Sequence, residues 1–384
     1  MRHRTSGILR DLVRQADPVL LALCCAATCY GLVMITSATR YLDTYRHVLV
    51  QGVAALLGVV LYFLATAVDI TEVVKKWKWL TAFNVGFILL LKTPLGLDVN
   101  GNLAWLDIPG FPVNIQPAEI VKLTFIMVLA YQLVWLKENR ELKSVLSIAM
   151  LGGHLALIVG LYYVISSDMG SALVYIFTFA CMAFVAGVAI RWFVLALLGG
   201  GIAFYLLWQE DIIPQYMKDR FIVLTDHSYQ PLDVGWHQTR SLLALGGGKL
   251  TGQGLFNGVQ TQSEFSGSLP FRHTDFIFSA MGEECGMIGC AIALTLLAAI
   301  IVRCLMTATK ARNRMEAYVC VGMAGMLIFQ TISNVGMCLF VMPVIGLTLP
   351  FFSYGGSSIL TLFAAMGLVS SVRSRTLPTW LHKE

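Results

Sequence analysis

Charged residues are scarce in this chain. Only 13% of its 384 residues are Asp, Glu, Lys or Arg, whereas 57% are hydrophobic, and the mean hydropathy is +0.73. A soluble globule has to cover its core with polar surface, and a chain of this composition has too little of it. The composition therefore argues against a soluble protein and favours an all-α polytopic membrane protein whose helices are solvated by lipid.

Several other features are missing. The 9 cysteines are an odd number, and none lies between residues 210 and 274, so neither a disulfide framework nor a cysteine metal site is indicated. The glycine-rich run at 246–258 follows no predicted strand and matches no P-loop, which argues against a nucleotide site. The net charge of +5 comes from loops predicted to be cytoplasmic, and it suggests anionic membrane lipid as a partner and no nucleic acid.

Apolar runs long enough to cross a bilayer recur along the chain. A helix needs roughly 20 apolar residues per crossing. We expect about ten transmembrane helices, within one, since the third run is short and ends at Pro94, and Ser167–Gly170 is compatible with a break inside one helix. The predicted helices cover residues 18–39, 47–68, 79–93, 116–136, 145–165, 169–189, 192–209, 275–302, 316–341 and 358–373.

The Lys and Arg residues predict how these helices are oriented, because positively charged loops stay on the cytoplasmic side. With a cytoplasmic N-terminus, most of the 27 basic residues, including Arg10, Lys76 and Arg312, fall on that side. Both termini are then cytoplasmic. Residues 210–274 form one large extracytoplasmic loop within a single membrane domain that covers 1–384.

Two connections stand out. The loop at 210–274 is far longer than an ordinary connection, and loops of this size are usually functional or disordered. Its aromatic residues, among them Trp236 and Phe256, argue against disorder, and we expect residues 236–245 to form a short amphipathic helix at the membrane surface. The connection at 343–358 is apolar but non-helical, so it has to be buried in protein or line a cavity.

Ionisable residues at membrane depth are costly and mark function by default. Asp275 is predicted at the start of the eighth helix, where a carboxylate serves either as an N-cap or as a catalytic base, and its position alone leaves both open. Glu283 follows two turns later and is displaced by roughly 80° around the axis, so it can share the face of Asp275. Glu284, displaced by roughly 180°, cannot.

Further candidates lie on other helices. Glu119 and Lys122, three residues apart, can form a buried ion pair that orients helices, or Lys122 can meet an anionic substrate on a cavity wall. Asp168 begins the sixth helix, where an N-cap is the plainer interpretation. Arg46 precedes the second helix as an interfacial anchor, and Trp105 fits an interfacial aromatic belt.

Taken together and in this order, these segments resemble the SEDS family of RodA, FtsW and SpoVE over nearly the whole chain. One such motif would be weak, but the ordered set is highly specific. The resemblance rests on Asp17–Pro18, Trp105, Gln116–Lys122, Asp168–Leu173, His273–Phe278 with Glu283–Glu284, Pro343–Gly346 and Ser353–Ser358.

The resemblance implies a peptidoglycan glycosyltransferase of the bacterial cytoplasmic membrane that polymerises lipid II on the outer face, with inversion, and releases undecaprenyl diphosphate. Asp275 corresponds to the essential acid of the family and is our candidate catalytic residue. The candidate substrate-binding residues are Arg46, Trp105, Glu119, Lys122, Asp168, Arg272 and Glu283.

The resemblance also implies a partner, a class B penicillin-binding protein with transpeptidase activity. A divalent cation, Mg²⁺ or Mn²⁺, that bridges phosphate oxygens to a carboxylate is chemically compatible with the reaction. The sequence contains no dedicated metal cage, so no cofactor is assigned.

The subgroup and the activity each have alternatives. Ala118 stands where the family usually has serine, and residues 347–350 vary the usual connection. The runs Gly235–Gln238 and Gln260–Gln262 look more like RodA, which implies a role in cell elongation and shape. The alternatives are an FtsW- or SpoVE-like role in division or sporulation, an inactive scaffold, or a flippase for a lipid-linked precursor. A flippase would also use intramembrane charges, but the chain shows no inverted repeat.

Overall fold

The computed structural model describes residues 15–99, 101–110, 113–226, 229, 235–265 and 268–376, and these are mostly helical. The elements, in chain order, are α2 (Pro18–Thr39), η1 (Arg40–Leu42), α3 (Arg46–Ala67), α4 (Ile70–Val74), α5 (Trp77–Leu89), η2 (Leu90–Lys92), β1 (Gly96–Val99), β2 (Asn102–Leu106), α6 (Pro117–Asn139), α7 (Val145–Ser166), α8 (Met169–Ala186), α9 (Ile190–Gln209), α10 (Gln215–Thr225), α11 (Trp236–Gly248), α12 (Ile277–Thr309), α13 (Arg314–Cys338) and α14 (Gly356–Thr376).

The predicted polytopic bundle is confirmed. Among the residues that the structure describes, 9 helices are long and apolar enough to cross a membrane. The remaining predicted helix, the third in chain order at 79–93, is α5, which has only 13 residues and is too short to span a bilayer alone. The count of about ten therefore holds, with α5 as the short member that the sequence already marked.

Local chemistry explains where several helices begin and end. The Asp17 carboxylate accepts the backbone N–H of Val19 at 3.2 Å and so caps α2. Asp168 caps α8 by accepting the N–H of Ser171 at 3.0 Å, which confirms the N-cap interpretation. Helix α8 ends before the predicted boundary because Gly187 adopts φ 96°, a left-handed conformation that stops the helix.

The structure adds elements that hydropathy did not predict. Strands β1 and β2 pair antiparallel into a hairpin that carries Trp105 opposite Leu97. Helix α10 lies within the long loop at 210–274, and the expected short helix near residue 236 is present as α11. The long loop is therefore folded over much of its described length.

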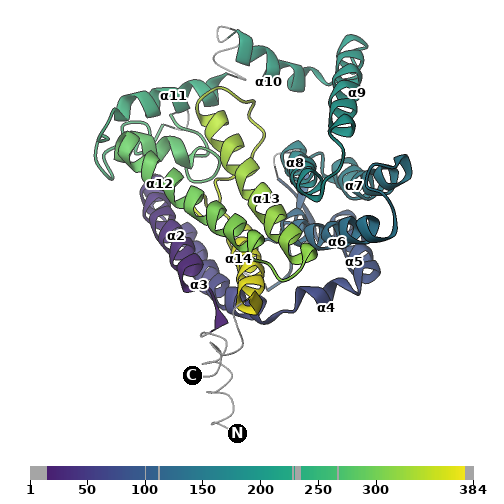
Figure 1. The fold of residues 1–384 in the computed structure, drawn as a ribbon. Coiled ribbons are helices and arrows are strands. Elements are labelled where there is room, and N and C mark those ends of the chain that lie inside the picture. The colour runs from purple at the N-terminus through teal and green to yellow at the C-terminus, as the bar shows by residue number, and fades with distance from the viewer. Residues whose placement is uncertain are drawn as a thin grey trace, which may run out of the picture.

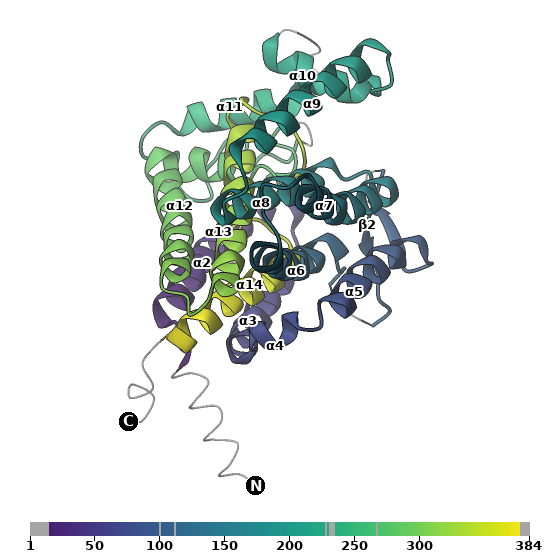
Figure 2. The same cartoon turned by 45° about the vertical axis from the view of Figure 1, so that its right-hand side comes forward.

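The helices form two groups that meet at α13. Helices α2, α3, α12, α13 and α14 lie together, and α5, α6, α7 and α8 form the second group, which contacts α13 through α6 and α8 (Figures 1 and 2). Helix α9 stands apart and contains no buried residue. The most extensive pairing of helices joins α3 to α14, where a Cβ on Gly367 would lie 2.5 Å from the carbonyl oxygen of Tyr62. Small residues allow such close approach between helix backbones.

Helix α12 is interrupted about one third of the way along its length. Gly286 has φ 68° and ψ −168°, so the helical hydrogen bonds are interrupted there. The glycine-rich segment 249–254 replaces them, because its backbone pairs with both sides of the break. The bonds are Gln253 N to Glu283 O at 2.9 Å, Gly254 N to Glu284 O at 3.0 Å, Met287 N to Lys249 O at 3.0 Å and Ile288 N to Leu250 O at 3.2 Å.

We predict that Gly248→Ala destabilises the protein, whereas Gly246→Ala does not. A Cβ on Gly248 would lie 1.8 Å from the Gly282 carbonyl oxygen, and a Cβ on Gly246 would meet nothing within 4 Å. Overpacking costs about 1–3 kcal/mol, so the melting temperature of the Gly248 variant should fall by several degrees, measured by thermal denaturation in detergent. Equal melting temperatures for the two variants would show that the end of α11 at Gly248 is not fixed against α12.

Candidate active site

The sequence motifs meet at one end of the bundle, where α2 ends and α3, α6, α8 and α14 begin; we call it the Asp275 end. The Gln116 backbone N–H donates to the Ser357 hydroxyl at 3.2 Å, and its side-chain amide donates to the Asp168 carboxylate at 3.4 Å. The rings of His47 and His273 lie 5.2 Å apart. Segments that are distant in sequence are therefore brought together around residues 273–275.

The backbone at Asp275 is fixed by a buried amide. The Asn334 side chain on α13 donates to the carbonyl oxygens of Asp275 and Leu347, both at 2.7 Å. One side chain thus ties the start of α12 to the connection at 343–355. Sequence reasoning missed Asn334, although the sequence shows it as a polar residue within an apolar run, and such residues often mark function.

The connection at 343–355 is held against the same segment by further polar groups. The Ser353 hydroxyl donates to the Thr274 carbonyl oxygen at 2.7 Å and accepts the Leu349 N–H at 2.8 Å. The Gln51 amide of α3 donates to the Ser353 carbonyl oxygen at 3.2 Å and accepts the Gly355 N–H at 3.0 Å. These bonds satisfy the polar groups of non-helical backbone, as a connection buried in protein requires.

The Asp275 carboxylate itself is left unbonded within the described ranges. Helix α12 starts after it, with Phe276 as an N-cap that makes no side-chain bond, so Asp275 does not cap the helix. A Cβ on Gly346 would lie 3.9 Å from Asp275 Oδ2, which places the carboxylate beside this side-chain-free position. Burial, and secondarily the negative charge of Asp168, raise the pKa of Asp275 to about 6.

Asp168 contributes charge to the site while its own hydrogen-bonding capacity is occupied. Its carboxylate accepts the hydroxyl of Ser171 at 2.7 Å and that of Tyr162 at 3.1 Å, besides the α8 cap. The negative charge of Asp168 disfavours the ionised form of the Asp275 carboxylate, because the two acids lie in the same region. Asp168 is therefore placed to tune Asp275 more than to exchange protons.

Glu119 and Lys122 form the ion pair that their spacing predicts. The Lys122 ammonium lies 2.6 Å from Glu119 Oε1, and both side chains are buried. The Thr361 hydroxyl of α14 donates to Glu119 Oε2 at 3.3 Å. The pair thus links α6 to α14 one turn below Gln116, and it lies close to the Asp275 end.

Arg46 and Trp105 lie at the margins of the site. Arg46 is exposed at the first position of α3, next to His47, whose ring lies 5.0 Å from that of Tyr354. Trp105 is half-buried on β2, which contacts α6 and α7. Neither side chain has a contact with Asp275 in the described part of the chain.

Arg272 and Glu283 are engaged elsewhere. The Arg272 guanidinium is buried and donates to the carbonyl oxygens of Gln260, Thr261 and Ser263. The Glu283 carboxylate accepts the backbone N–H groups of Gln260 and Thr261, each at 2.7 Å. Both charges hold the long loop in place, and the structure does not bring either group to the Asp275 carboxylate. A buried loop needs such partners for its polar backbone, a demand that hydropathy does not reveal.

Sequence reasoning also missed a cluster of imidazole and aromatic rings that lies next to Asp275. His47, His273 and Tyr354 lie within 5.0–5.8 Å of one another. Burial, with the nearby His47 and Arg272, lowers the pKa of His273 to about 4, so its ring is neutral at physiological pH. The Nδ1 atoms of both histidines are buried without a partner in the part of the chain that the structure describes.

A divalent cation finds no ready site here. Within the described residues, no group of three or more His, Cys, Asp or Glu side chains is placed to hold a metal ion. Asp168 is the acid whose charge acts on Asp275, but its carboxylate already accepts several hydrogen bonds. We therefore derive no catalytic step through a metal.

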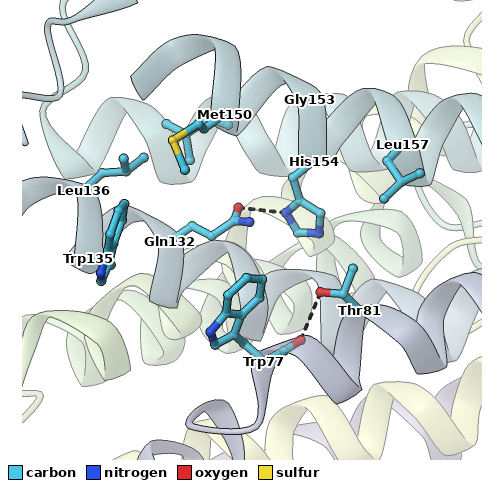
Figure 3. A pocket seen from close by; sticks show the side chains of 10 residues that line it. Trp77, Thr81, Gln132, Trp135, Leu136, Met150, Gly153, His154 and Leu157 are labelled. Atoms are coloured by element: carbon cyan, nitrogen blue, oxygen red, sulfur yellow. Dashed lines mark hydrogen bonds between the residues drawn. The ribbon is translucent and has the colours of Figure 1, made fainter. Parts of the chain in front are cut away.

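Two cavities lie outside this cluster. One, of about 300 Å³, lies between α5, α6 and α7, where His154 and Gln132 approach to 2.9 Å beside Trp77 and Trp135 (Figure 3). The other, of about 410 Å³, lies at the Asp275 end between η1, the start of α3 and Phe256.

The family is established by comparison. The sequence pattern of the FtsW/RodA/SpoVE family, described as cell cycle protein, matches residues 18–377. Probable peptidoglycan glycosyltransferases FtsW of Pseudomonas fluorescens and of Geobacter sp. are 32% and 30% identical to the chain. Both alignments cover 94% of this chain, and they cover 89% and 97% of those relatives.

Solved structures give the same result. A chain from work on the structural coordination of polymerization and crosslinking by a peptidoglycan synthase complex superposes with a TM-score of 0.78 at 29% identity, covering 94% of this chain and 98% of that chain. Rod shape determining protein RodA of Thermus thermophilus superposes with a TM-score of 0.69 at 28% identity, covering 94% and 98%. Because the family pattern covers nearly the whole bundle and relatives reach 30% identity or more, the chain belongs to the FtsW/RodA/SpoVE family.

Proposed function

We propose that this protein is a peptidoglycan glycosyltransferase that polymerises lipid II, with Asp275 as the general base. The supporting observation is a half-buried aspartate whose backbone carbonyl oxygen accepts the Asn334 amide at 2.7 Å but whose carboxylate oxygens stay free of hydrogen bonds in the described structure. Its pKa of about 6 suits a base at neutral pH, because the ionised form dominates and still takes up a proton readily.

In this reaction the 4-hydroxyl of an acceptor GlcNAc attacks the anomeric carbon of a donor MurNAc. A new C–O bond forms as the bond from that carbon to the diphosphate breaks, and undecaprenyl diphosphate leaves with the electron pair. The hydroxyl proton passes to Asp275. Attack opposite the leaving group inverts the anomeric carbon.

The leaving diphosphate gathers negative charge, which fixed cations stabilise. Lys122 and Arg46 are the proposed cations. Lys122 is buried beside Glu119, which holds the ammonium group in place and neutralises part of its charge. Arg46 is exposed at the rim of the site. Arg272 and Glu283 are assigned to loop support instead.

The distribution of Lys and Arg supports a topology with both termini cytoplasmic and the Asp275 end outside. The proposed partner is a class B penicillin-binding protein, in line with a relative that belongs to a peptidoglycan synthase complex.

The runs Gly235–Gln238 and Gln260–Gln262 favour a role in elongation, whereas the FtsW names of the relatives favour a role in division. Complementation of RodA-depleted and FtsW-depleted cells decides between the two roles.

We predict that Asp275→Asn leaves the protein folded but lowers polymerisation of lipid II by about a hundredfold or more, because a general base typically contributes about 10²–10⁴-fold. Gel analysis of glycan made by purified protein measures this. Asp107→Asn, which changes an exposed carboxylate directly after β2, is the matched control. Wild-type rates in the Asp275 variant would contradict the assignment, and lipid translocation without polymer in liposomes would favour a flippase.

The rate should fall about tenfold per pH unit below about pH 6, since protonation removes the base. The negative charge of Asp168 helps to raise the pKa of Asp275, so Asp168→Asn should move this acid limb to lower pH by up to about one unit. Asparagine keeps the α8 cap. A pH–rate profile of both proteins makes the comparison, and superimposable profiles would exclude electrostatic coupling between the two acids.

The role of the buried pair can be tested with a double variant. Removing one partner of a buried pair costs about 3–5 kcal/mol, so Lys122→Ala alone confuses folding with binding. Glu119→Gln combined with Lys122→Met removes both charges and should keep the fold, but it should require more lipid II for half-maximal rate. A wild-type dependence on lipid II would assign the pair to helix packing alone.

A further inference from the structure

The cavity of about 410 Å³ at the Asp275 end is built from side chains that the proposed chemistry does not use. Its walls are the ends of α2 and η1, the start of α3 and the loop residue Phe256. Two contacts connect these walls to the catalytic segment. The Arg272 guanidinium lies 3.5 Å from the ring centroid of Tyr41, and His47 packs against His273, two residues before Asp275.

The lining combines several kinds of polar group with aromatic faces. Arg40 supplies a guanidinium, Asp43 a carboxylate, and Thr44 and Tyr45 supply hydroxyls. Arg40, Asp43 and Thr44 are exposed, and the Tyr45 side chain is 76% exposed. Within the described ranges, no acidic side chain forms an ion pair with Arg40. These groups are available to a ligand.

The wall opposite Arg40 is made at a cost in backbone strain. A turn runs from Gly254 to Asn257, closed by a 3.0 Å backbone hydrogen bond, and Phe256 occupies it with φ 65°. Glycine or asparagine usually takes such a position. The strained conformation sets the Phe256 ring 5.7 Å from the Arg40 guanidinium. Strain of this kind persists where surrounding structure enforces it and is typical of ligand-binding sites.

This combination of charged, hydroxyl and aromatic groups favours one class of ligand over others. A phosphate would meet the Asp43 carboxylate as well as Arg40, and a lipid tail would leave both charges without partners. A saccharide suits all of the groups, since its hydroxyls donate to a carboxylate and accept from a guanidinium. The apolar face of a sugar ring can also pack on an aromatic ring such as Phe256.

We propose that this cavity is a second carbohydrate site, which binds an N-acetylhexosamine unit of the glycan remote from the bond being formed. The inference rests on the proposed function, because a polymerising enzyme handles a lengthening glycan. Binding of a remote unit keeps the strand attached between additions. Its loss raises the dissociation rate and shortens the product more than it slows each addition.

The test uses the purified full-length protein with lipid II, and it compares Arg40→Ala and Phe256→Gly with Lys92→Ala. Lys92 is an exposed cation outside the cavity. Phe256→Gly removes the ring but relieves the positive φ, so it should not lower thermal stability. We expect both cavity variants to shorten the mean glycan by about threefold or more while the initial rate of lipid II consumption stays within about twofold of wild type. The Lys92 variant should match wild type.

A direct binding measurement separates this inference from the proposed function. The probe is a soluble tetrasaccharide of alternating GlcNAc and MurNAc without lipid or peptide, titrated calorimetrically into the detergent-solubilised protein. Both cavity variants should weaken its binding by about fivefold or more, equivalent to about 1 kcal/mol. Unchanged affinity and strand length would overturn the proposal. Loss of phosphatidylglycerol binding instead would make the cavity a phospholipid headgroup site. A wild-type protein that binds the probe but makes no glycan would refute only the proposed function.

Discussion

Non-helical backbone at membrane depth has no water to satisfy its N–H and C=O groups, so the protein itself must supply their partners. Non-helical backbone buried in the protein meets the same demand, and in the partly buried connection at 343–355 Asn334, Ser353 and Gln51 provide these partners. Two of these side chains, Ser353 and Asn334, also donate to the carbonyl oxygens of Thr274 and Asp275. The bonds that satisfy the connection therefore also position Asp275, and residues 273–275 cannot shift without breaking bonds to α13 and to the connection itself.

This constraint separates the acids by use. Glu283 and Glu284 accept hydrogen bonds from the long loop and from Ser37, Asp168 caps α8, and Glu119 pairs with Lys122. Asp275 differs because it is positioned through its carbonyl oxygen and not through its carboxylate. A carboxylate with no bonds to break can receive a proton without disturbing the fold, which is the property required of a base.

Sequence reasoning succeeded wherever the determinant was local. Hydropathy located the long spans, the i,i+3 spacing gave the Glu119–Lys122 pair, and a polar residue before an apolar run gave the Asp168 cap. It failed wherever the determinant lay far along the chain. The hairpin with Trp105, the loop contacts of Arg272 and the clamp by Asn334 depend on partners that no local pattern specifies. Sequence reasoning also left the role of the glycine-rich run at 246–258 open, whereas in the structure Gly248 and Gly252 permit backbone contact with α12.

The break at Gly286 makes α12 and the segment 249–254 a single modular unit. Each supplies backbone donors or acceptors that the other lacks, with Gln253 and Met287 donating in opposite directions across the gap. Neither piece would therefore keep its backbone partners if it were exchanged alone for the corresponding piece of another family member. A chimaera that exchanges the long loop has to carry residues 282–288 with it, so that recombination boundaries fall in the uninterrupted part of α12 beyond the break.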